Sequence, residues 1–254
     1  MIRGLYTAAA GMLAAQTLSG VIADNAANVN TPGYKEETAS SEAFPTMLIE
    51  RLGGGSDAAP ALLGSAGTGV AVERVTKLVT QGELQPTDSK TDLALASEGF
   101  FVVQTPLGER YTRDGQFHIS PDGVLSTADG YPVLGSRGPI VLSGAEFTIA
   151  GDGTVSAPGI DPANAPRLRI VALPSAGLLR EGQSLYNVSN GQAADLPPGQ
   201  VDVRQGYLEK STVDTARQLV QMVSVMRAYE ANQKVIQVQD ATLEKAVNEV
   251  GKTT

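Results

Sequence analysis

Apolar residues recur at intervals of three and four along the beginning of the chain. The repeat runs through Ile2, Leu5, Ala9, Met12, Leu18, Ile22 and Val29, with a shift near Gln16. This spacing places the apolar side chains on one face of a helix, and an alanine-rich, proline-free segment favours the same structure. We therefore predict a helix over 2–29. Gly4, Gly11 and Gly20 lower its intrinsic stability, so we expect other helices to pack closely against them.

The helical pattern is followed directly by turn-forming residues, in the stretch NAANVNTPGYK at 25–35. Pro32 cannot donate a backbone hydrogen bond, and it pushes Thr31 out of the helical region. Gly33 supplies a flexible turn. The sequence therefore predicts that the helix stops here.

A second and longer helical pattern occupies the end of the chain. Residues spaced by three and four are Leu219, Met222, Met226, Tyr229, Gln233, Ile236, Asp240, Leu243, Val247 and Val250, and most of them are apolar. A helix from about 213 to 250 would be about 57 Å long at about 1.5 Å per residue. A sustained seam of this kind is typical of a coiled-coil surface. Two interpretations stay open: the helix packs on its own domain, or its apolar face awaits other chains.

Between the two helical patterns, short apolar runs alternate with turn signals. The runs lie at 100–105, 116–120, 130–134, 139–142, 146–150 and 167–173. Dipeptides that favour tight hairpins begin at Asp114, Asp122, Asp129, Asp152 and Asn190, each followed by glycine. Short strands separated by about ten residues are typical of antiparallel all-β domains.

These patterns divide the chain into three expected parts. Residues 1–35 and 211–254 would form a coiled-coil assembly domain of long terminal helices, and 76–210 an all-β outer domain inserted between them. Residues 36–75 would be a loop or linker region, because 52–69 are rich in Gly, Ala and Ser. The segment GSAGTG at 64–69 does not match the G-x-G-x-x-G fingerprint, and it is interpreted as loop rather than as a phosphate site.

Composition narrows the classes of function. The 254 residues include no cysteine, which excludes disulfides, thiolate metal sites and cysteine nucleophiles. The net charge of −8 argues against a nucleic-acid partner, which would require clustered Lys and Arg. The sequence contains no uninterrupted run of about 18 apolar residues, the length that a membrane-spanning helix requires. No clear cleavage site of a signal peptide follows the N-terminal segment. We therefore expect neither a membrane span nor a cleaved signal peptide.

The sequence offers little for catalysis. His118 is the single histidine, and no G-x-S-x-G motif accompanies it, so a structural histidine in a strand is the favoured interpretation. The aspartates of the Asp-Gly dipeptides lack the spacing of a calcium loop, and turn formation explains them more simply. Paired carboxylates for glycoside hydrolysis stay open, because such pairs form only in three dimensions. We expect no enzyme activity, no cofactor and no metal site.

Three stretches together resemble one protein family. They are the opening helix with ANVNTPGYK (27–35), then TDLALASEGFFVVQTPLGERYTRDGQFHISPDGVL (91–125), then MRAYEANQKVIQVQDATLEKAV (226–247). In this order and at these distances they are similar to the rod and hook family of bacterial flagellar axial proteins, and most similar to its distal rod type. The proximal rod and hook types remain alternatives within the family. From another class, a surface module whose β domain binds a glycan also remains open.

The resemblance implies a structural role in the flagellar basal body. In that family the terminal segments pair as an α-helical coiled coil, and many subunits stack these pairs into the inner wall of a tube. The tube is the drive shaft that transmits torque and lets exported subunits pass. The implied partners are copies of the chain, other rod and hook proteins, the flagellar export apparatus and, where an outer membrane is present, outer ring proteins. The implied location is outside the cytoplasmic membrane, after export without a cleaved signal.

The resemblance and the apolar seams together assign candidate residues. Those expected at assembly interfaces are Leu5, Met12, Ile22, Asn25, Asn28, Asn30, Thr31, Pro32, Gly33, Tyr34, Leu219, Met222, Met226, Tyr229, Glu230, Asn232, Ile236, Leu243 and Val247. Those expected in the β domain are Gly99, Phe100 and Phe101 in its core, with Tyr111, Thr112 and Arg113 on a neighbouring strand. We expect both termini to be poorly packed in the free subunit and to become ordered on assembly.

Overall fold

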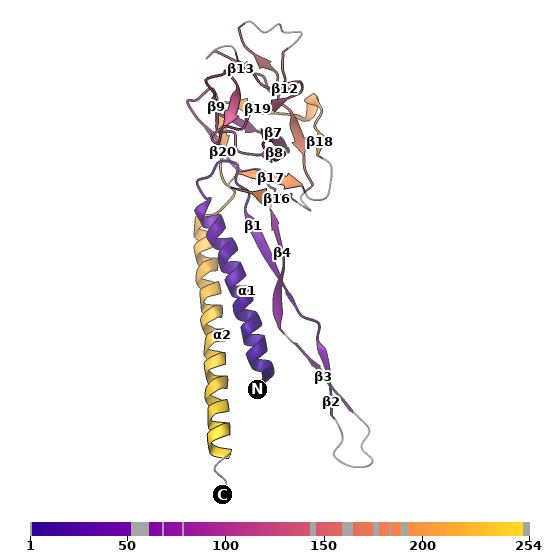
Figure 1. The fold of residues 1–254 in the computed structure, drawn as a ribbon, viewed down its shortest axis with the longest axis vertical. Coiled ribbons are helices and arrows are strands. Elements are labelled where there is room, and N and C mark those ends of the chain that lie inside the picture. Colours follow the sequence, from indigo (N-terminus) through magenta and orange to yellow (C-terminus); the bar gives the residue numbers. More distant parts are fainter. Residues whose placement is uncertain are drawn as a thin grey trace. The chain divides into compact units, whose positions relative to one another are not determined.

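A computed structural model describes residues 2–51, 61–67, 69–77, 79–142, 146–158, 165–174, 178–182, 184–188 and 193–250. The chain is mostly β, with one helix near each end (Figure 1). It divides into two compact units. The first contains Met1–Asp24, Glu37–Thr76 and Thr215–Thr254, and the second contains Asn25–Glu36 and Lys77–Asp214.

The N-terminal helix α1 spans Ile2–Ala27, which confirms the helix expected over 2–29 except for its last residues. After Ala27 the backbone continues as two overlapping turns. The N–H of Asn28 donates to the carbonyl of Asn25 at 3.1 Å, and the N–H of Thr31 donates to the carbonyl of Asn28 at 3.2 Å. The Thr31 hydroxyl also donates to the Asn28 side chain at 3.2 Å. Short polar side chains of this kind compete with helical hydrogen bonding, so the helix ends before Pro32 is reached.

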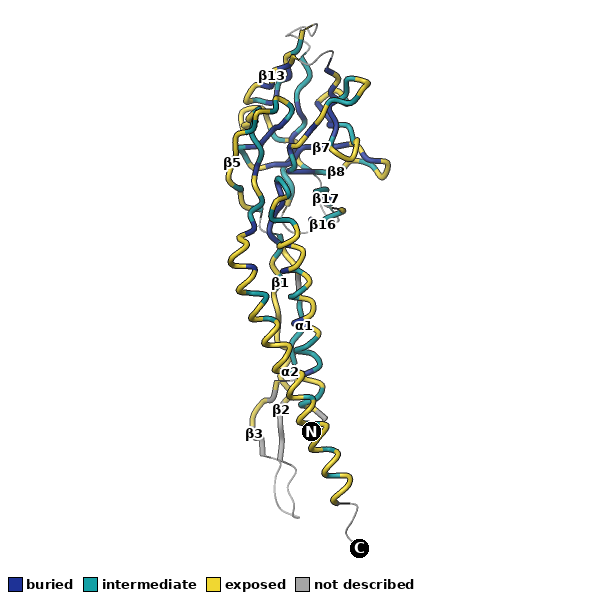
Figure 2. The backbone as a smooth tube through the Cα atoms, turned by 90° about the vertical axis from the view of Figure 1, so that its left-hand side faces the viewer, coloured by how far each residue is buried: buried dark blue, intermediate teal, exposed yellow. Residues whose placement is uncertain are grey.

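The C-terminal helix α2 spans Thr215–Val250, close to the expected 213–250. Within the first unit, α1 and α2 lie side by side and run in opposite directions (Figures 1 and 2). The hydroxyl of Ser19 on α1 lies 3.4 Å from the sulfur of Met222 on α2. The two terminal helices therefore pair within one chain.

The first unit also contains a β ribbon, where the sequence indicated a loop or linker. Strand β1 (Glu37–Ala43) pairs with β4 (Val70–Lys77), and β2 (Met47–Arg51) pairs antiparallel with β3 (Ala61–Ala66). The loop interpretation of 52–69 is therefore wrong for 61–66, while 52–60 lie outside the described residues. Small side chains weaken a strand, but backbone hydrogen bonds between two strands need no side-chain burial.

The second unit is built on a six-stranded antiparallel sheet. Its strand order is β16 (Leu178–Glu181), β17 (Leu185–Val188), β8 (Gly108–Thr112), β7 (Phe100–Thr105), β15 (Ile170–Ala172) and β18 (Ala194–Asp195). The all-β character expected between the helices is thus confirmed for the described part of the chain.

Short strand pairs and one 3-10 turn complete the second unit. The pairs are β5 (Leu84–Pro86) with β20 (Tyr207–Glu209), β6 (Leu93–Leu95) with β19 (Val203–Gln205), β9 (Phe117–Ile119) with β10 (Leu125–Thr127), β11 (Leu134–Gly135) with β12 (Gly138–Pro139), and β13 (Thr148–Ile149) with β14 (Val155–Ser156). The turn η2 spans Pro198–Gln200.

The Asp-Gly dipeptides have three different outcomes. Asp122-Gly123 and Asp152-Gly153 join β9 to β10 and β13 to β14, with glycine φ values of 77° and 81°, which confirms the hairpins expected there. Asp129-Gly130 also makes a turn, with φ 84° at the glycine. Gly115 instead lies against the backbone of Leu93, where a Cβ would come 1.5 Å from the carbonyl oxygen. The dipeptide at Asn190 lies outside the described residues.

The core of the second unit has two layers, and β7 contributes to both. Phe101 and Val103 point into the larger cluster, and Phe100 and Val102 into the smaller one. Edge-to-face aromatic pairs occur on each side, with centroids 5.2 Å apart for Phe101 and Phe117, and 5.4 Å apart for Phe100 and Tyr186. Because both faces of β7 are covered, its sequence is almost continuously apolar. Figure 2 shows that buried residues gather in this unit, while most residues of the two helices are exposed or half-buried.

Candidate assembly interface

The face of α1 that packs on α2 is made of small residues. Ala8, Ala14 and Ala15 are buried, and Ile22 is buried near the end of the helix. A Cβ added to Gly11 would lie 2.7 Å from the amide nitrogen of Asn232, and one added to Gly4 would lie 2.9 Å from that of Gln239. The expectation that a helix packs closely on the α1 glycines is therefore confirmed for these two positions. Gly20 has no described atom within 4 Å of such a Cβ.

The structure separates the expected α2 seam residues into two sets. Met222, Asn232, Ile236 and Leu243 are buried or half-buried. Leu219, Met226 and Val247 are exposed to 61%, 54% and 72%, and Tyr229 and Glu230 are also exposed. The half-buried positions also include Val225 and Gln239, so the inward-facing seam is displaced by one residue from the expected one at several positions.

An apolar surface remains uncovered on the helix pair. Large apolar side chains that are exposed are Tyr6 and Leu13 on α1, and Leu219, Val220, Val223, Met226, Tyr229, Val235, Val238 and Val247 on α2. Beside them lies a groove of about 390 Å³ lined by Ala15, Gln16, Ser19, Val225, Met226, Tyr229 and Glu230. Exposed apolar side chains in this number, beside a groove, are typical of a protein–protein interaction site.

The residues expected at interfaces on α1 and in the following turn are distributed differently. Leu5 and Met12 are half-buried, and Ile22 and Asn25 are buried. In the turn, Asn28, Thr31 and Pro32 are half-buried, Asn30 is exposed, and Gly33 and Tyr34 are buried. We call residues 25–35, in which the helix ends, the stop motif. Most of its expected interface residues are therefore buried or half-buried already in the single chain.

Gly33 fits its place in the second unit for two reasons. Its φ of 67° lies in the left-handed region, and its N–H donates to the carbonyl of Glu209 at 2.7 Å. A Cβ on Gly33 would also lie 2.3 Å from the carbonyl oxygen of Arg113. The stop motif is thus packed against the backbone that follows β8.

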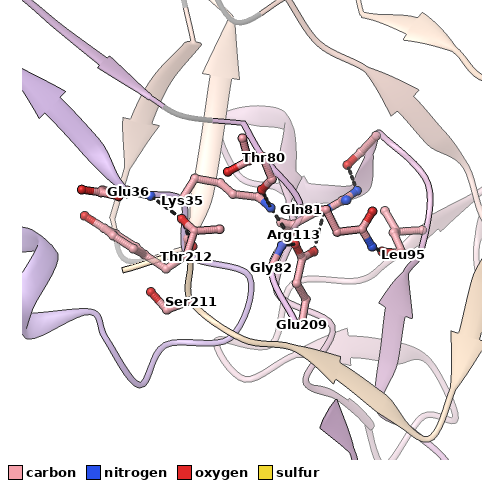
Figure 3. A network of polar contacts seen from close by, with 12 residues as sticks. Lys35, Glu36, Thr80, Gln81, Gly82, Leu95, Arg113, Glu209, Ser211 and Thr212 are labelled. Atoms are coloured by element: carbon pink, nitrogen blue, oxygen red, sulfur yellow. Dashed lines mark hydrogen bonds and ion pairs between the residues drawn. The ribbon is translucent and has the colours of Figure 1, made fainter. Parts of the chain in front are cut away.

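Three buried charges form a cluster beside this contact, shown in Figure 3. Glu209 accepts from the Lys35 ammonium at 2.6 Å and from the Arg113 guanidinium at 2.7 Å, and the side chains of Lys35 and Glu209 are each 1% exposed. The N–H of Gly82 also donates to Glu209, at 2.6 Å. Burial lowers the pKa of Lys35 and the Arg113 charge lowers it further, while the Glu209 carboxylate opposes both effects.

Backbone carbonyls accept further hydrogen bonds from the two cations of the charged cluster. Lys35 donates to the carbonyl of Thr80 at 2.6 Å. Arg113 donates to the carbonyls of Gly99 and Ser97. The cluster therefore joins the stop motif, the strand β20 that precedes α2, and the Gly-Phe-Phe segment. Sequence reasoning missed Glu209, since no local pattern marks a glutamate at the end of a short strand as buried.

Tyr34 is held on the other side of the stop motif. Its hydroxyl donates to the Asn25 side chain at 3.1 Å and accepts from Arg180 at 3.0 Å. The Arg180 guanidinium also lies 5.3 Å from the centroid of the Tyr34 ring, within cation–π range. These contacts explain how an aromatic residue in a loop becomes buried.

The residues expected in the β domain lie together around β7 and β8. Phe100 and Phe101 are buried on β7, and Tyr111 and Thr112 lie on the paired strand β8, with Arg113 directly after it. Gly99 has φ 137°, and a Cβ there would lie 2.8 Å from side-chain atoms of Ile170 and Leu196. The Gly-Phe-Phe segment therefore serves packing.

The described residues show no arrangement typical of catalysis. His118 is exposed on β9 opposite Ser126, and no group of three described His, Asp or Glu residues could hold a metal ion. The pKa of Asp114 is raised to about 6, chiefly by burial of its carboxyl. The hydrogen bond from the Gln116 N–H lowers this pKa, and the charges of Asp92 and Asp129 raise it. This carboxyl is adjacent to Arg113, so we attribute its environment to the packing at the stop motif.

By length and composition, Arg3–Ala27 of α1 is apolar enough to cross a membrane, with a mean hydropathy of 1.3. This is weak support for a span, because packed helices of water-soluble proteins and signal sequences meet the same criterion. The expectation of no membrane span rested on the lack of an uninterrupted apolar run, and it stays a prediction.

Three protein-family models match separate parts of the chain, near its beginning, in its middle and near its end. Residues 5–35 match the flagella basal body rod proteins, 94–157 the D1 domain of the flagellar hook proteins FlgE/F/G, and 204–249 the C-terminal region of the flagellar basal body rod proteins FlgEFG. Lys35, Arg113 and Glu209 each lie in a different one of these regions. The charged cluster therefore joins all three.

Curated relatives match over nearly the whole chain. The flagellar hook-basal body complex protein FlhO of Bacillus subtilis is 37% identical over 99% of this chain and 100% of its own length. The flagellar basal-body rod protein FlgG of Buchnera aphidicola subsp. Schizaphis graminum is 35% identical over 96% and 98%. The flagellar basal-body rod protein FlgF of Escherichia coli K12 is 36% identical over 93% of each chain. The similarity therefore includes both units.

Proposed function

The chain belongs to the flagellar basal-body rod protein family, and we propose that it is a structural subunit of the distal rod. The family consists of structural proteins, so a structural role in the rod follows from membership. In the proposed role, copies of the chain assemble helically into the drive-shaft tube that transmits torque and lets exported subunits pass. We propose no enzyme activity.

The observation that carries this proposal is the uncovered apolar surface of the helix pair. Full burial of a large apolar side chain contributes about 1.5–3 kcal/mol, so a row of exposed ones favours association. The groove beside Met226 and Tyr229 is lined by both helices, which suits the insertion of side chains from a neighbouring helix. Copies of the same chain are the proposed occupants, because a helical assembly buries one surface of each subunit repeatedly.

Each of the expected domains has its own role in the proposed assembly. Residues 1–35 and 211–254 would act as the coiled-coil assembly domain, and 76–210 would face outward from the tube. The residues expected at interfaces that are exposed here, such as Leu219, Met226 and Val247, are the proposed contacts between subunits. We also propose that the helix pair becomes fully ordered only on assembly, since its apolar surface lacks a partner in the single chain.

The choice of the distal rod over related types rests on the sequence. The chain length and the variable segment after the stop motif support the distal type, and relatives named FlgG match 98% of their own length in several species. Relatives named FlgF and FlhO match as well, so the proximal rod and hook types remain the alternatives. The proposed partners are copies of the chain, other rod and hook proteins, the export apparatus and outer ring proteins, outside the cytoplasmic membrane.

Substitutions on the uncovered surface test the role. Leu219→Asp with Met226→Asp should abolish motility and leave basal bodies without a complete rod in electron micrographs, because charges would face the proposed neighbours. Ser224→Asp is the control, since Ser224 is exposed and is not one of the exposed apolar side chains, and it should leave motility close to normal. Full motility with the double substitution would contradict the proposed interface. Full motility after deletion of the gene would contradict the function.

A further inference from the structure

Two amide side chains of α2 lie in spaces left by two glycines of α1. The amide nitrogen of Asn232 lies 2.7 Å from where a Cβ of Gly11 would be, and that of Gln239 lies 2.9 Å from where a Cβ of Gly4 would be. We call these the amide–glycine pairs. On each helix the two positions are seven residues apart, and the helices run in opposite directions, so both pairs form in one axial register.

The rest of the helix contact does not define that register as sharply. Apolar and small residues repeat along both helices at helical spacing, and such seams are compatible with sliding by seven residues, about 10 Å along the axis. A polar residue within a seam is the common device that selects one register, at some cost in stability.

The Gln239 side chain shows this cost. Its amide oxygen is buried and accepts no hydrogen bond from the described residues. A buried, unpaired polar atom destabilises a contact, whereas an apolar side chain of similar size would not. The buried oxygen at this position therefore contributes no stability through hydrogen bonding.

Sliding by seven residues breaks at least one pair in either direction. In one direction Gly11 comes to face Val225 and Gln239 passes beyond Gly4. In the other, Gly11 faces Gln239, and Asn232 comes to face Leu18, a large side chain that leaves no space for an amide. Only the observed register places both amides at glycines.

We propose that Asn232 and Gln239, seated against Gly11 and Gly4, set the axial register of α1 against α2. The register in turn fixes which exposed apolar residues of the two helices lie side by side. This goes beyond the proposed function, because it concerns pairing within one chain and does not depend on the identity of the assembly.

Engineered cysteines measure the register directly, since the chain has no cysteine of its own. Ser19→Cys with Met222→Cys reports the observed register, because the two side chains are in contact at 3.4 Å. Ser19→Cys with Tyr229→Cys or with Thr215→Cys reports a slip by seven residues in either direction. Full-length chains are oxidised in cell extracts and as purified protein, and intramolecular cross-links are separated from dimers by gel mobility.

The test replaces both amides by leucine, which keeps their bulk and removes their polarity. In Asn232→Leu with Gln239→Leu, the slipped cross-links should rise at least about fivefold relative to the observed-register cross-link. Gln233→Leu with Gln237→Leu is the matched control, because both of these amides are exposed, and it should change nothing. An unchanged cross-link pattern in the first variant would overturn the proposal. Loss of all cross-links would also overturn it, since leucines should preserve pairing while freeing its register.

A second pair of variants acts from the side of α1. Gly11→Ala places a methyl group against Asn232 and should lower the observed-register cross-link at least about fivefold. Gly20→Ala carries the same change where no described atom lies within 4 Å, and it should leave the cross-link intact. Equal cross-linking in both would exclude a role for the Gly11 pair. Motility, scored separately, tests the proposed function and does not enter this comparison.

Discussion

Glu209 binds three segments that lie far apart in the sequence, through Lys35, Gly82 and Arg113. It is the only described carboxylate in contact with the buried ammonium of Lys35 and the buried guanidinium of Arg113. Removal of one partner from a buried ion pair leaves charges that neither water nor protein compensates, which makes such changes more costly than the pair itself is favourable.

Glu209→Gln should therefore destabilise the chain by about 3–5 kcal/mol, because two cations stay buried without their anion. Urea unfolding followed by the signal of the β strands measures this. Glu83→Gln is the control, since Glu83 pairs with Lys210 at an exposed position and such pairs contribute about 0–1 kcal/mol. Equal stability of the two variants would contradict the role assigned to the charged cluster.

Asp114 predicts a pH dependence of stability. Its pKa is raised from 3.8 to about 6, so between these values the folded chain binds more protons than the unfolded chain. The free energy of unfolding therefore receives a contribution that falls as the pH rises from about 4 to 6. Asp114→Asn should remove this fall, so the variant should gain stability relative to the wild type between pH 4 and 7.

Urea unfolding at several pH values tests the dependence. The difference between Asp114→Asn and the wild type should be smallest near pH 4 and level off above pH 7. Asp122→Asn, in an exposed turn, supplies the comparison for an unrelated aspartate. A difference that does not vary with pH would show that Asp114 is ionised equally in both states.

Among the elements, α1 ends for a different reason from the one its sequence suggested. Pro32 and Gly33 marked the stop, yet the helix ends at Ala27, and the intervening residues form hydrogen-bonded turns. Gly33, Tyr34 and Lys35 are each held by the second unit. The helix thus ends in hydrogen-bonded polar turns, and tertiary contacts hold the residues that follow, so Pro32 is compatible with this end and not required for it.

Pro32→Ala should therefore leave the helix content unchanged and cost only about 0.4–1 kcal/mol, the entropy that proline removes from the unfolded chain. Gly33→Ala should cost more, because it adds both a Cβ clash with Arg113 and a strained φ. Circular dichroism and thermal unfolding compare the two. A gain of helix in Pro32→Ala would restore the proline as the cause of the stop.

The elements also show the limits of pattern reading. Both helices, the β character between them and the hairpins at Gly123 and Gly153 were predictable, because periodicity and turn chemistry are local. The inward face of α2 was misplaced by one residue at several positions, and at Asn232 and Gln239 the glycines opposite explain the inward placement. Strand β3 was missed because Gly, Ala and Ser, which make up most of it, carry little strand signal. The cluster at Glu209 joins residues 96 and 174 positions away from it, beyond any local pattern.

For the whole molecule, the two units differ in how their apolar residues are covered. The second unit has buried clusters on both faces of β7, while the helix pair leaves many large apolar side chains exposed. Local stability follows buried contacts, so the helices should open far more easily than the β strands in the free chain.

Amide hydrogen exchange tests this difference between the units. In the free chain, amides of α1 and α2 should exchange at least about a hundredfold faster than those of β7 and β8, and assembly should protect the helices. The exposed turn at Asp122 serves as the reference for fast exchange. Equal protection of helices and core strands in the free chain would contradict the proposed ordering on assembly.

The ribbon has a consequence for how relatives of this chain can diverge. The Thr76 hydroxyl donates to the carbonyl of Thr38 at 3.4 Å, so the two ends of the ribbon are adjacent. An insertion between neighbouring ends leaves the rest of the fold in place, and added length raises the entropy of loop closure only slowly. Relatives can therefore differ in the length of the ribbon while the core of the second unit stays the same.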